Sequence, residues 1–426
     1  MTEMTYERAE QLRKSKNFQD AVEGFSILWK EESTPMIGWR YAFCLRKLGL
    51  LEQAEKIARE AVEKFPQDQW SVNELIWVLY DKELKPARAN NDLGRSLQYG
   101  KEILSVDPKG LALQRTSLLL MKVAKSRGNW EVVLEWADLL CDEQLSKEAS
   151  KFGKKRVFSD CETWYVGRAR ALYELERYEE ARDFAQQGLQ EFPNEVFLLR
   201  IAALSLAELG QLEDAINEMR DLLLHPRADW YFKNDLAELE MRAGHVEEAY
   251  RLVCQSLIDS QQSEDKKLGA FQILTVLALE IKRFDVAAAH IELSKSIREQ
   301  AGWKIKNEQI TMEHKTRLGF EQLGEEWPVL PQKINELTKL CRKYWQEGVS
   351  SGKQRYQGTV KFYDPEKKYT FIARDDEGED AFVLVKDLPD KCRKAGTRVD
   401  FVLQKSFDHK KNRESISAVY LRHLDL

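Results

Sequence analysis

Gly210-Gln-Leu-Glu-Asp-Ala215 and Gly244-His-Val-Glu-Glu-Ala249 are two versions of one sequence pattern, placed 34 residues apart. Each contains a turn residue, then acidic residues that suit the start of a helix, then a small residue on that helix. Further versions are Lys16-Asn-Phe-Gln-Asp-Ala21, Gly49-Leu-Leu-Glu-Gln-Ala54 and Glu176-Arg-Tyr-Glu-Glu-Ala181. A recurrence of about 34 residues with helix-turn-helix patterning predicts a stack of helix pairs.

The recurring unit resembles the tetratricopeptide repeat, in which the small residue lets two helices approach closely. Proline often closes the unit, as at Pro66, Pro108, Pro193 and Pro226. The resemblance covers about residues 3 to 300 and implies about eight units in an all-α, right-handed solenoid. Stacked pairs of this kind leave a concave groove that binds a protein partner. By helix register, the groove candidates are Arg170, Tyr173, Arg200 and Asn234.

The repeat pattern weakens in two places and then stops. Residues 85–91 look like an insertion, and residues 146–156 like a polar, basic connector. A helix over residues 331–346 should cover the end of the stack, and Ser350-Ser-Gly352 should be a linker. We therefore expect helical repeats over 1–300, capping helices and a linker over 301–350, and a barrel over 351–426. No strand is expected before about residue 340.

The last part of the chain has a different period. Gly358-Thr-Val-Lys-Phe-Tyr-Asp364, residues 367–372 and residues 379–383 alternate apolar and polar side chains, which predicts strands. Because residues two apart share a face of a strand, Tyr369 and Phe371 should point the same way. By the same rule, Lys361 and Tyr363 should share one face, and Val360 and Phe362 the other.

These strands resemble the cold-shock domain, a small all-β barrel of the OB type that binds single-stranded RNA or DNA. Gly358-Thr-Val-Lys-Phe-Tyr-Asp364 matches the family's Gly-x-Val-Lys-Trp-Phe-Asn. Lys367-Lys-Tyr-Thr-Phe-Ile372 matches Lys-Gly-Phe-Gly-Phe-Ile, and Asp380-Ala-Phe-Val-Leu-Val385 matches Asp-Val-Phe-Val-His-Phe. Gly396-Thr-Arg-Val399-Asp-Phe401 matches its Gly-x-x-Val-x-Phe strand. The resemblance covers about residues 358 to 421.

The resemblance implies that aromatic rings stack on bases while lysines meet phosphates. The residues that it assigns to nucleic-acid binding are Lys361, Phe362, Tyr363, Lys367, Tyr369, Phe371 and Phe382. Phe362 enters this set through the family, in which a tryptophan at that position binds, although strict alternation would bury it. The chain departs from the family at Lys368 and Thr370, which replace glycines, and at Leu384 and Val385, which replace a histidine and an aromatic residue. The loop over residues 408–413 adds basic residues beside the barrel.

Composition excludes several other classes of protein. The six cysteines are far apart and form no Cys-x-x-Cys pair, so free thiols in a cytoplasmic protein are expected. We see no secretory signal, no apolar run long enough to span a membrane, and no motif for catalysis, metal or cofactor binding. Residues 351–426 hold 16 basic and 13 acidic residues, whereas the whole chain holds 66 and 71. The acidic excess therefore lies in the first 350 residues.

Three functions fit these patterns. The leading one is a non-enzymatic adaptor that binds a protein through its repeats and single-stranded nucleic acid, RNA more than DNA, through its barrel. The second is a scaffold for proteins only, whose barrel has lost nucleic-acid binding; Leu384 and Val385 favour it. The third has the solenoid itself binding RNA through the connector Lys151-Phe-Gly-Lys-Lys-Arg156. The acidic character of the first 350 residues disfavours the third.

Overall fold

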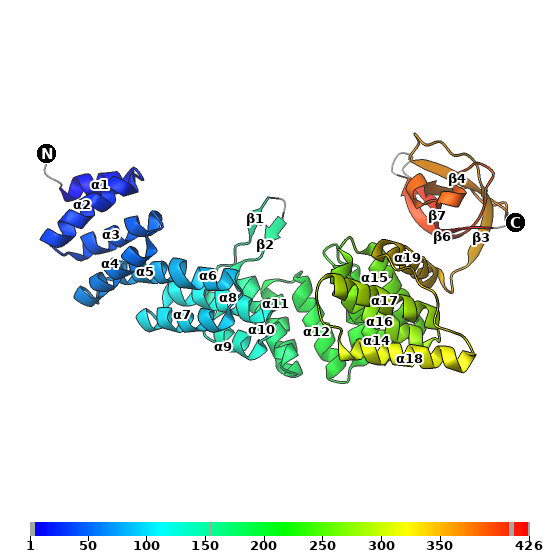
Figure 1. Ribbon diagram of the computed structural model, residues 1–426, viewed down its shortest axis with the longest axis horizontal. Coiled ribbons are helices and arrows are strands. Elements are labelled where there is room, and N and C mark those ends of the chain that lie inside the picture. The colour runs from blue at the N-terminus through cyan, green and yellow to red at the C-terminus, as the bar shows by residue number, and fades with distance from the viewer. Residues whose placement is uncertain (1–4, 154, 409–412, 425–426) are drawn as a thin grey trace. The chain divides into compact units, whose positions relative to one another are not determined.

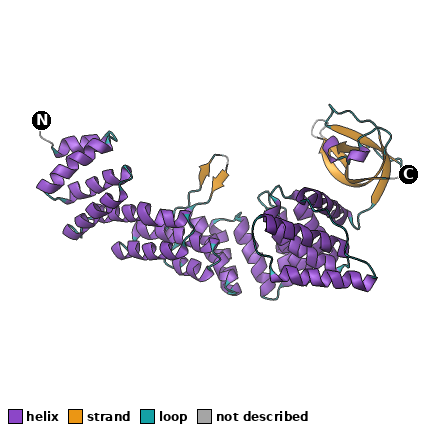
Figure 2. Ribbon diagram, in the orientation of Figure 1, coloured by secondary structure: helices purple, strands orange, loops and turns teal. Residues whose placement is uncertain are grey.

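The computed structural model describes residues 5–153, 155–408 and 413–424. Helices form most of the chain up to Ser350, and strands form the closed barrel that follows (Figures 1 and 2). The predicted fold class, a helical-repeat solenoid followed by a small β-barrel, is thus confirmed. The chain divides into two compact units, residues 1–211 and 212–426, which are described in turn.

Helices that follow one another along the chain pack together in the first unit. The small residues predicted at the helix contacts, Ala21, Ala54 and Ala181, are all fully buried. The bounds of the helices are α1 Tyr6–Lys14, α2 Phe18–Glu31, α3 Pro35–Lys47, α4 Leu51–Lys64, α5 Gln69–Leu79, α6 Lys85–Ala89, α7 Leu93–Val106, α8 Gly110–Ser126, α9 Trp130–Ala137, α10 Asp160–Glu174, α11 Tyr178–Glu191 and α12 Val196–Glu208.

The stretch predicted as an insertion is helical. Helix α5 continues through a π-helical turn, Tyr80–Leu84, directly into α6. Proline inside a helix removes one backbone hydrogen bond and collides with the preceding turn. The wider π turn lies directly before Pro86, and the Lys85 amide donates to the Tyr80 carbonyl. We infer that this turn absorbs the proline, which a sequence pattern alone does not show.

The prediction that no strand precedes residue 340 is wrong. Strands β1, Ser150–Phe152, and β2, Lys155–Val157, form a short antiparallel hairpin in the predicted connector. Phe152 pairs with Lys155, and Gly153, which follows β1, has a φ of 61°. Two-residue hairpin loops require such positive φ values, which glycine adopts without strain.

Helices of the second unit pack around a buried centre of aromatic and apolar residues. Helix α19 packs against α15 and α17. The Trp345 indole N–H donates to Nε2 of the buried His290 at 2.7 Å. The bounds are α13 Leu212–Leu223, α14 Phe232–Arg242, α15 Val246–Asp259, α16 Leu268–Glu280, α17 Phe284–Gln300, α18 Asn307–Leu323 and α19 Ile334–Ser350.

The barrel closes in the strand order β3-β4-β5-β7-β6, so each strand has two neighbours. Strands β5 and β7 are parallel, and the other pairs are antiparallel. Its core contains Val360, Ile372, Val383, Val399 and Phe401. The bounds are β3 Arg355–Val360, β4 Tyr369–Arg374, β5 Ala381–Leu384, β6 Arg398–Asp408 and β7 Arg413–His423.

Close packing explains the glycine that opens the predicted motif. A Cβ at Gly358 would lie 2.3 Å from the Ala373 carbonyl oxygen on the neighbouring strand. No side chain fits at that distance, so the contact between β3 and β4 needs glycine. The Gly358 position of the sequence pattern is therefore a packing requirement of the barrel.

Candidate nucleic-acid interface

Four aromatic rings form a continuous cluster on the outside of the barrel, and we call Phe362, Tyr369, Phe371 and Phe382 the ring cluster. Tyr369 stacks on Phe382, with centroids 5.8 Å apart and planes 25° apart. Phe371 meets both of them edge-on, at 5.9 and 5.8 Å. Phe362 completes the cluster, 6.4 Å from Tyr369 and 6.5 Å from Phe371.

The alternation of β4 and β5 puts three of these rings on one face. In β4, Thr370 and Ile372 are buried, whereas Tyr369 is 42% exposed and Phe371 is half-buried. The register pairs Phe371 directly with Phe382 on β5. Side chains opposite one another in antiparallel strands lie close together. The prediction that Tyr369 and Phe371 share a face with Phe382 beside them is confirmed.

Phe362 reaches the cluster because β3 ends before it. The last strand residue is Val360, and the Lys361 amide then donates to the Phe371 carbonyl at 2.9 Å. Beyond that point the two-residue alternation no longer applies, so Phe362 is not buried as strict alternation would require, and its ring is half-exposed. The buried Thr370 hydroxyl donates to the Phe362 carbonyl and ties this segment to β4. The glycine-to-threonine departure thus has a structural use.

Tyr363, Lys361 and Lys367 differ in their contacts with the ring cluster. Tyr363 is half-buried, and its ring is in contact with none of the four rings among the residues described. Lys367 Nζ lies 5.2 Å above the Phe362 ring and 3.7 Å from Asp364. Lys361 Nζ lies 2.6 Å from Asp380 Oδ2. Asp380 is an acidic residue of the site that the sequence pattern did not single out.

The family departures fall at the rim of the cluster. Leu384 pairs with Tyr369 across β4 and β5, which places an aliphatic side chain where the family has an imidazole. Lys368 is exposed beside Tyr369 and adds a positive charge. Val385 follows β5 and donates its amide to the Lys368 carbonyl at 3.0 Å. Residues 409–412 of the predicted basic loop lie outside the described residues.

The predicted groove residues are divided between the two units. In the first unit, the Arg170 guanidinium lies 5.8 Å from the Tyr173 ring centroid and forms an ion pair with Glu174. Burial raises the pKa of Tyr173 to about 12. Arg200 is half-buried on α12. Asn234 belongs to the second unit and is only 8% exposed, which limits what it can offer a partner.

The described part of the chain shows no arrangement of side chains that would hold a metal ion. There, no three histidine, cysteine or acidic side chains come close enough together to hold a metal ion. None of the helices described has the length and apolar character needed to cross a membrane. All six cysteines are free thiols.

Residues 154–196 and 202–265 match the tetratricopeptide repeat family. This stretch of the chain therefore contains tetratricopeptide repeats, as the 34-residue recurrence predicted. No curated protein matches the chain in sequence.

Solved structures with a similar helical fold include a tetratricopeptide repeat protein from Parabacteroides merdae, at 11% identity and a TM-score of 0.33. That match covers 64% of this chain and 96% of the other. A second is the human IFIT1 dimer with PPP-AAAA, at 13% identity and a TM-score of 0.38, covering 80% of each chain. These likenesses concern the helical fold alone.

Proposed function

We propose that this protein is a non-enzymatic, cytoplasmic adaptor that binds a protein partner through its repeats and single-stranded nucleic acid, RNA more than DNA, through a cold-shock-like barrel. The observation that carries the second part is the ring cluster with Lys361 and Lys367 beside it. Exposed aromatic rings interleaved with cations bind unpaired bases by stacking, at about 1–3 kcal/mol per base.

The strand order of the barrel supports the same proposal. A closed five-stranded barrel with a parallel contact between β5 and β7 is compatible with the OB type. In that type, the face formed by the second and third strands binds oligonucleotides. Here those strands are β4 and β5, which supply three of the four rings.

The protein partner follows from the repeats. Tetratricopeptide repeats expose a groove that serves as an interaction surface. The distribution of charge also favours different sites for nucleic acid and for protein, because the acidic excess lies outside residues 351–426. Nucleic acid is a polyanion and is repelled by acidic surface. We therefore assign the nucleic acid to the barrel and the protein to the repeats.

Removing two rings from the full-length chain tests the barrel. We expect Phe371→Ala with Phe382→Ala to weaken binding of a labelled pyrimidine-rich RNA by about 2–4 kcal/mol, if the two stacks add. Fluorescence anisotropy at low salt measures this loss.

A control separates stacking from general loss of aromatic surface. Trp70→Ala removes a ring that is 63% exposed but lies in the first unit, and it should leave RNA binding unchanged. The thermal unfolding midpoint of the barrel in the double variant must equal that of the wild-type protein. Wild-type protein that binds no single strand at low salt contradicts the proposal.

The alternative is a scaffold for proteins only. It is favoured by Leu384 beside Tyr369 and by the ion pair between Lys361 and Asp380, which uses up a lysine that would meet phosphate. Under this alternative the ring cluster binds an apolar peptide segment. The same RNA titration distinguishes the two, because the alternative predicts no binding for either protein.

A further inference from the structure

A row of polar side chains begins beside the ring cluster and runs along the outside of β3. Gly358 and Val360 are buried, so the alternate residues Arg355, Gln357 and Thr359 point outward, in line with the exposed Lys361 beyond the strand. Six residues of strand span roughly 20 Å. The row therefore joins the ring cluster, which begins next to Lys361, to the opposite end of β3.

A cleft of about 680 Å³ lies at that opposite end, within the second unit. It is bounded by α15, the start of α17, the end of α19, the first residue of β3 and the end of β7. The Tyr420 hydroxyl donates to Gln255 on α15 at 3.1 Å, and Arg422 donates to Ser350 on α19 at 3.4 Å. These bonds join the barrel to the helices beside the cleft.

Basic side chains outnumber acidic ones in the lining of this cleft. The cations are Arg283, Lys353, Arg355 and Arg422, and the carboxylates are Glu247 and Glu347. Arg283 is held by Asp285 at 3.0 Å and also lies 3.6 Å from Glu347, and Arg355 is held by Asp400 at 2.5 Å.

Lys353 and Arg422 have no carboxylate within 4.0 Å among the described residues. Burial, and then repulsion from Arg251, lowers the pKa of Lys353. An anion placed in the cleft would relieve this repulsion. Arg422 donates to the Ser350 hydroxyl and Lys353 Nζ lies 5.4 Å from the Tyr420 ring centroid, so neither charge is neutralised by a carboxylate among the described residues. The cleft thus has two cations without an acidic partner, a favourable balance of charge and room for a ligand.

We propose that the nucleic-acid strand stacked on the ring cluster continues along the outer row of β3 and that this cleft binds its phosphate groups through Lys353 and Arg422. The proposal rests on the proposed function of the barrel. It adds a second contact region, formed jointly by the barrel and the last helices, and it predicts that the helices take part in binding longer strands.

The test uses the full-length chain and two pyrimidine RNAs, of about 4 and about 16 bases, which bracket the site sizes of OB-type barrels. Lys353→Gln with Arg422→Gln removes the two cations of the cleft. For the longer RNA, we expect the slope of log affinity against log salt to flatten by about 1.4, because each single-strand phosphate contact contributes about 0.7. Binding of the shorter RNA should not change.

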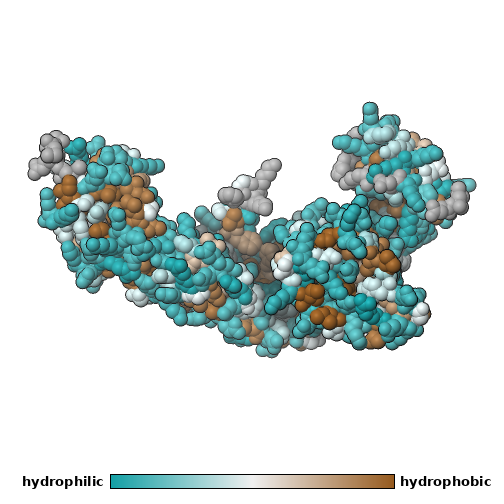
Figure 3. Space-filling view, viewed as in Figure 1, coloured by the Kyte–Doolittle hydropathy of each residue, from teal (hydrophilic) through white to brown (hydrophobic). Residues whose placement is uncertain are grey.

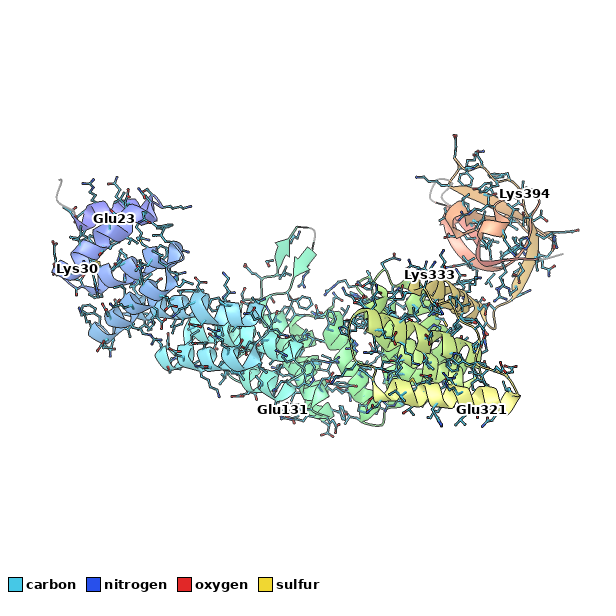
Figure 4. The ribbon with its side chains drawn as sticks, in the orientation of Figure 1. Glu23, Lys30, Glu131, Glu321, Lys333 and Lys394 are labelled. Carbon is cyan, nitrogen blue, oxygen red and sulfur yellow. The ribbon has the colours of Figure 1, made fainter. Side chains whose placement is uncertain are left out.

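The matched control is Lys333→Gln with Lys394→Gln, which removes the same charge. Both side chains are exposed and absent from the cleft lining, and Figure 4 labels them near the start of α19 and on the barrel. This control should leave the slope for the longer RNA as in wild type. If the double variant of the cleft fails to fold, Lys353→Gln alone should flatten the slope by about 0.7.

The outcomes separate the two proposals. An unchanged slope in the folded cleft variant, or an equal loss for both RNA lengths, overturns the cleft while the barrel function stands. Wild-type protein that binds neither RNA overturns the barrel function itself.

Discussion

Asp380 decides how available Lys361 is to a ligand. The two side chains form an ion pair at 2.6 Å and are 40% and 48% exposed, respectively. Exposed pairs of this kind contribute about 0–1 kcal/mol to stability. A phosphate that binds Lys361 must compete with Asp380 for it.

We therefore expect Asp380→Asn to leave the melting midpoint almost unchanged and to tighten RNA binding by up to about five-fold. Anisotropy titrations of both proteins measure the change. Glu366→Gln removes a carboxylate from the loop between β3 and β4 that pairs with no lysine among the described residues. Equal effects of the two substitutions would mean that net charge, and not release of Lys361, governs binding.

His290 shows how burial sets a pH dependence. It is completely buried on α17, its ring nitrogens lie against the Val286 carbonyl and the Trp345 indole, and burial lowers its pKa to about 4. In an unfolded chain the pKa is about 6.5. The unfolded state therefore takes up a proton first as the pH falls.

This difference predicts a loss of stability on acidification. The contribution of His290 is fully present above about pH 6.5 and falls by roughly 3 kcal/mol as the pH drops to about 4. His290→Gln should flatten the pH dependence of the denaturation midpoint between these values. His314→Gln, which replaces an exposed histidine, should keep the wild-type profile. Identical profiles for all three proteins would contradict the assignment.

At the scale of the element, helix contacts depend on small residues. Ala249 on α15 is fully buried, and α15 packs against α14. A larger side chain must push the helices apart, at a cost of about 1–3 kcal/mol. Ala249→Leu should therefore lower the melting midpoint of the second unit, measured by circular dichroism. Ala301→Leu, at an exposed alanine after α17, should not. Equal midpoints would show that the inferred repeat register is wrong.

The regular elements could be predicted because local signals decide them. The acidic helix starts and buried alanines of the repeats are visible in single segments, as is the alternation in β4. The π turn before Pro86 and the β1–β2 hairpin could not, since each is a local exception to the surrounding pattern. No periodic signal marks either of them.

The candidate site was only partly predictable for a related reason. Tyr369 and Phe371 share a face by strand alternation, which a sequence shows directly. The exposure of the Phe362 ring depends on where β3 ends. The role of Asp380 depends on its ion pair with Lys361, which only the folded barrel brings together. Lys353 and Arg422 lie 69 residues apart in the chain, and folding brings them to one cleft. Residues that lie far apart in the chain and meet only on folding cannot be recognised from their spacing in the sequence.

At the scale of the whole molecule, the face seen in Figure 3 is mostly polar and the charge is unevenly divided along the chain. Charged residues make up 32% of the chain, and the visible face is mostly hydrophilic with separate small apolar patches (Figure 3). The basic excess lies in the last 76 residues, where the ring cluster also lies. The proposed nucleic-acid interface and the acidic excess therefore lie in different parts of one chain.

Closure of the barrel has a consequence for solubility. A strand with an unpaired edge offers backbone groups that can template pairing with another molecule, which is a route to aggregation. In the barrel each strand has a neighbour on both sides, but among the described residues β6 pairs with β7 alone beyond Val402. Within the described residues, free edges belong to the β1–β2 hairpin, whose strands are only three residues long, and to the part of the β6–β7 pair beyond Val402. Self-association by strand pairing should therefore start at this hairpin or at the far end of the β6–β7 pair, and it should spare the strands that are paired on both sides.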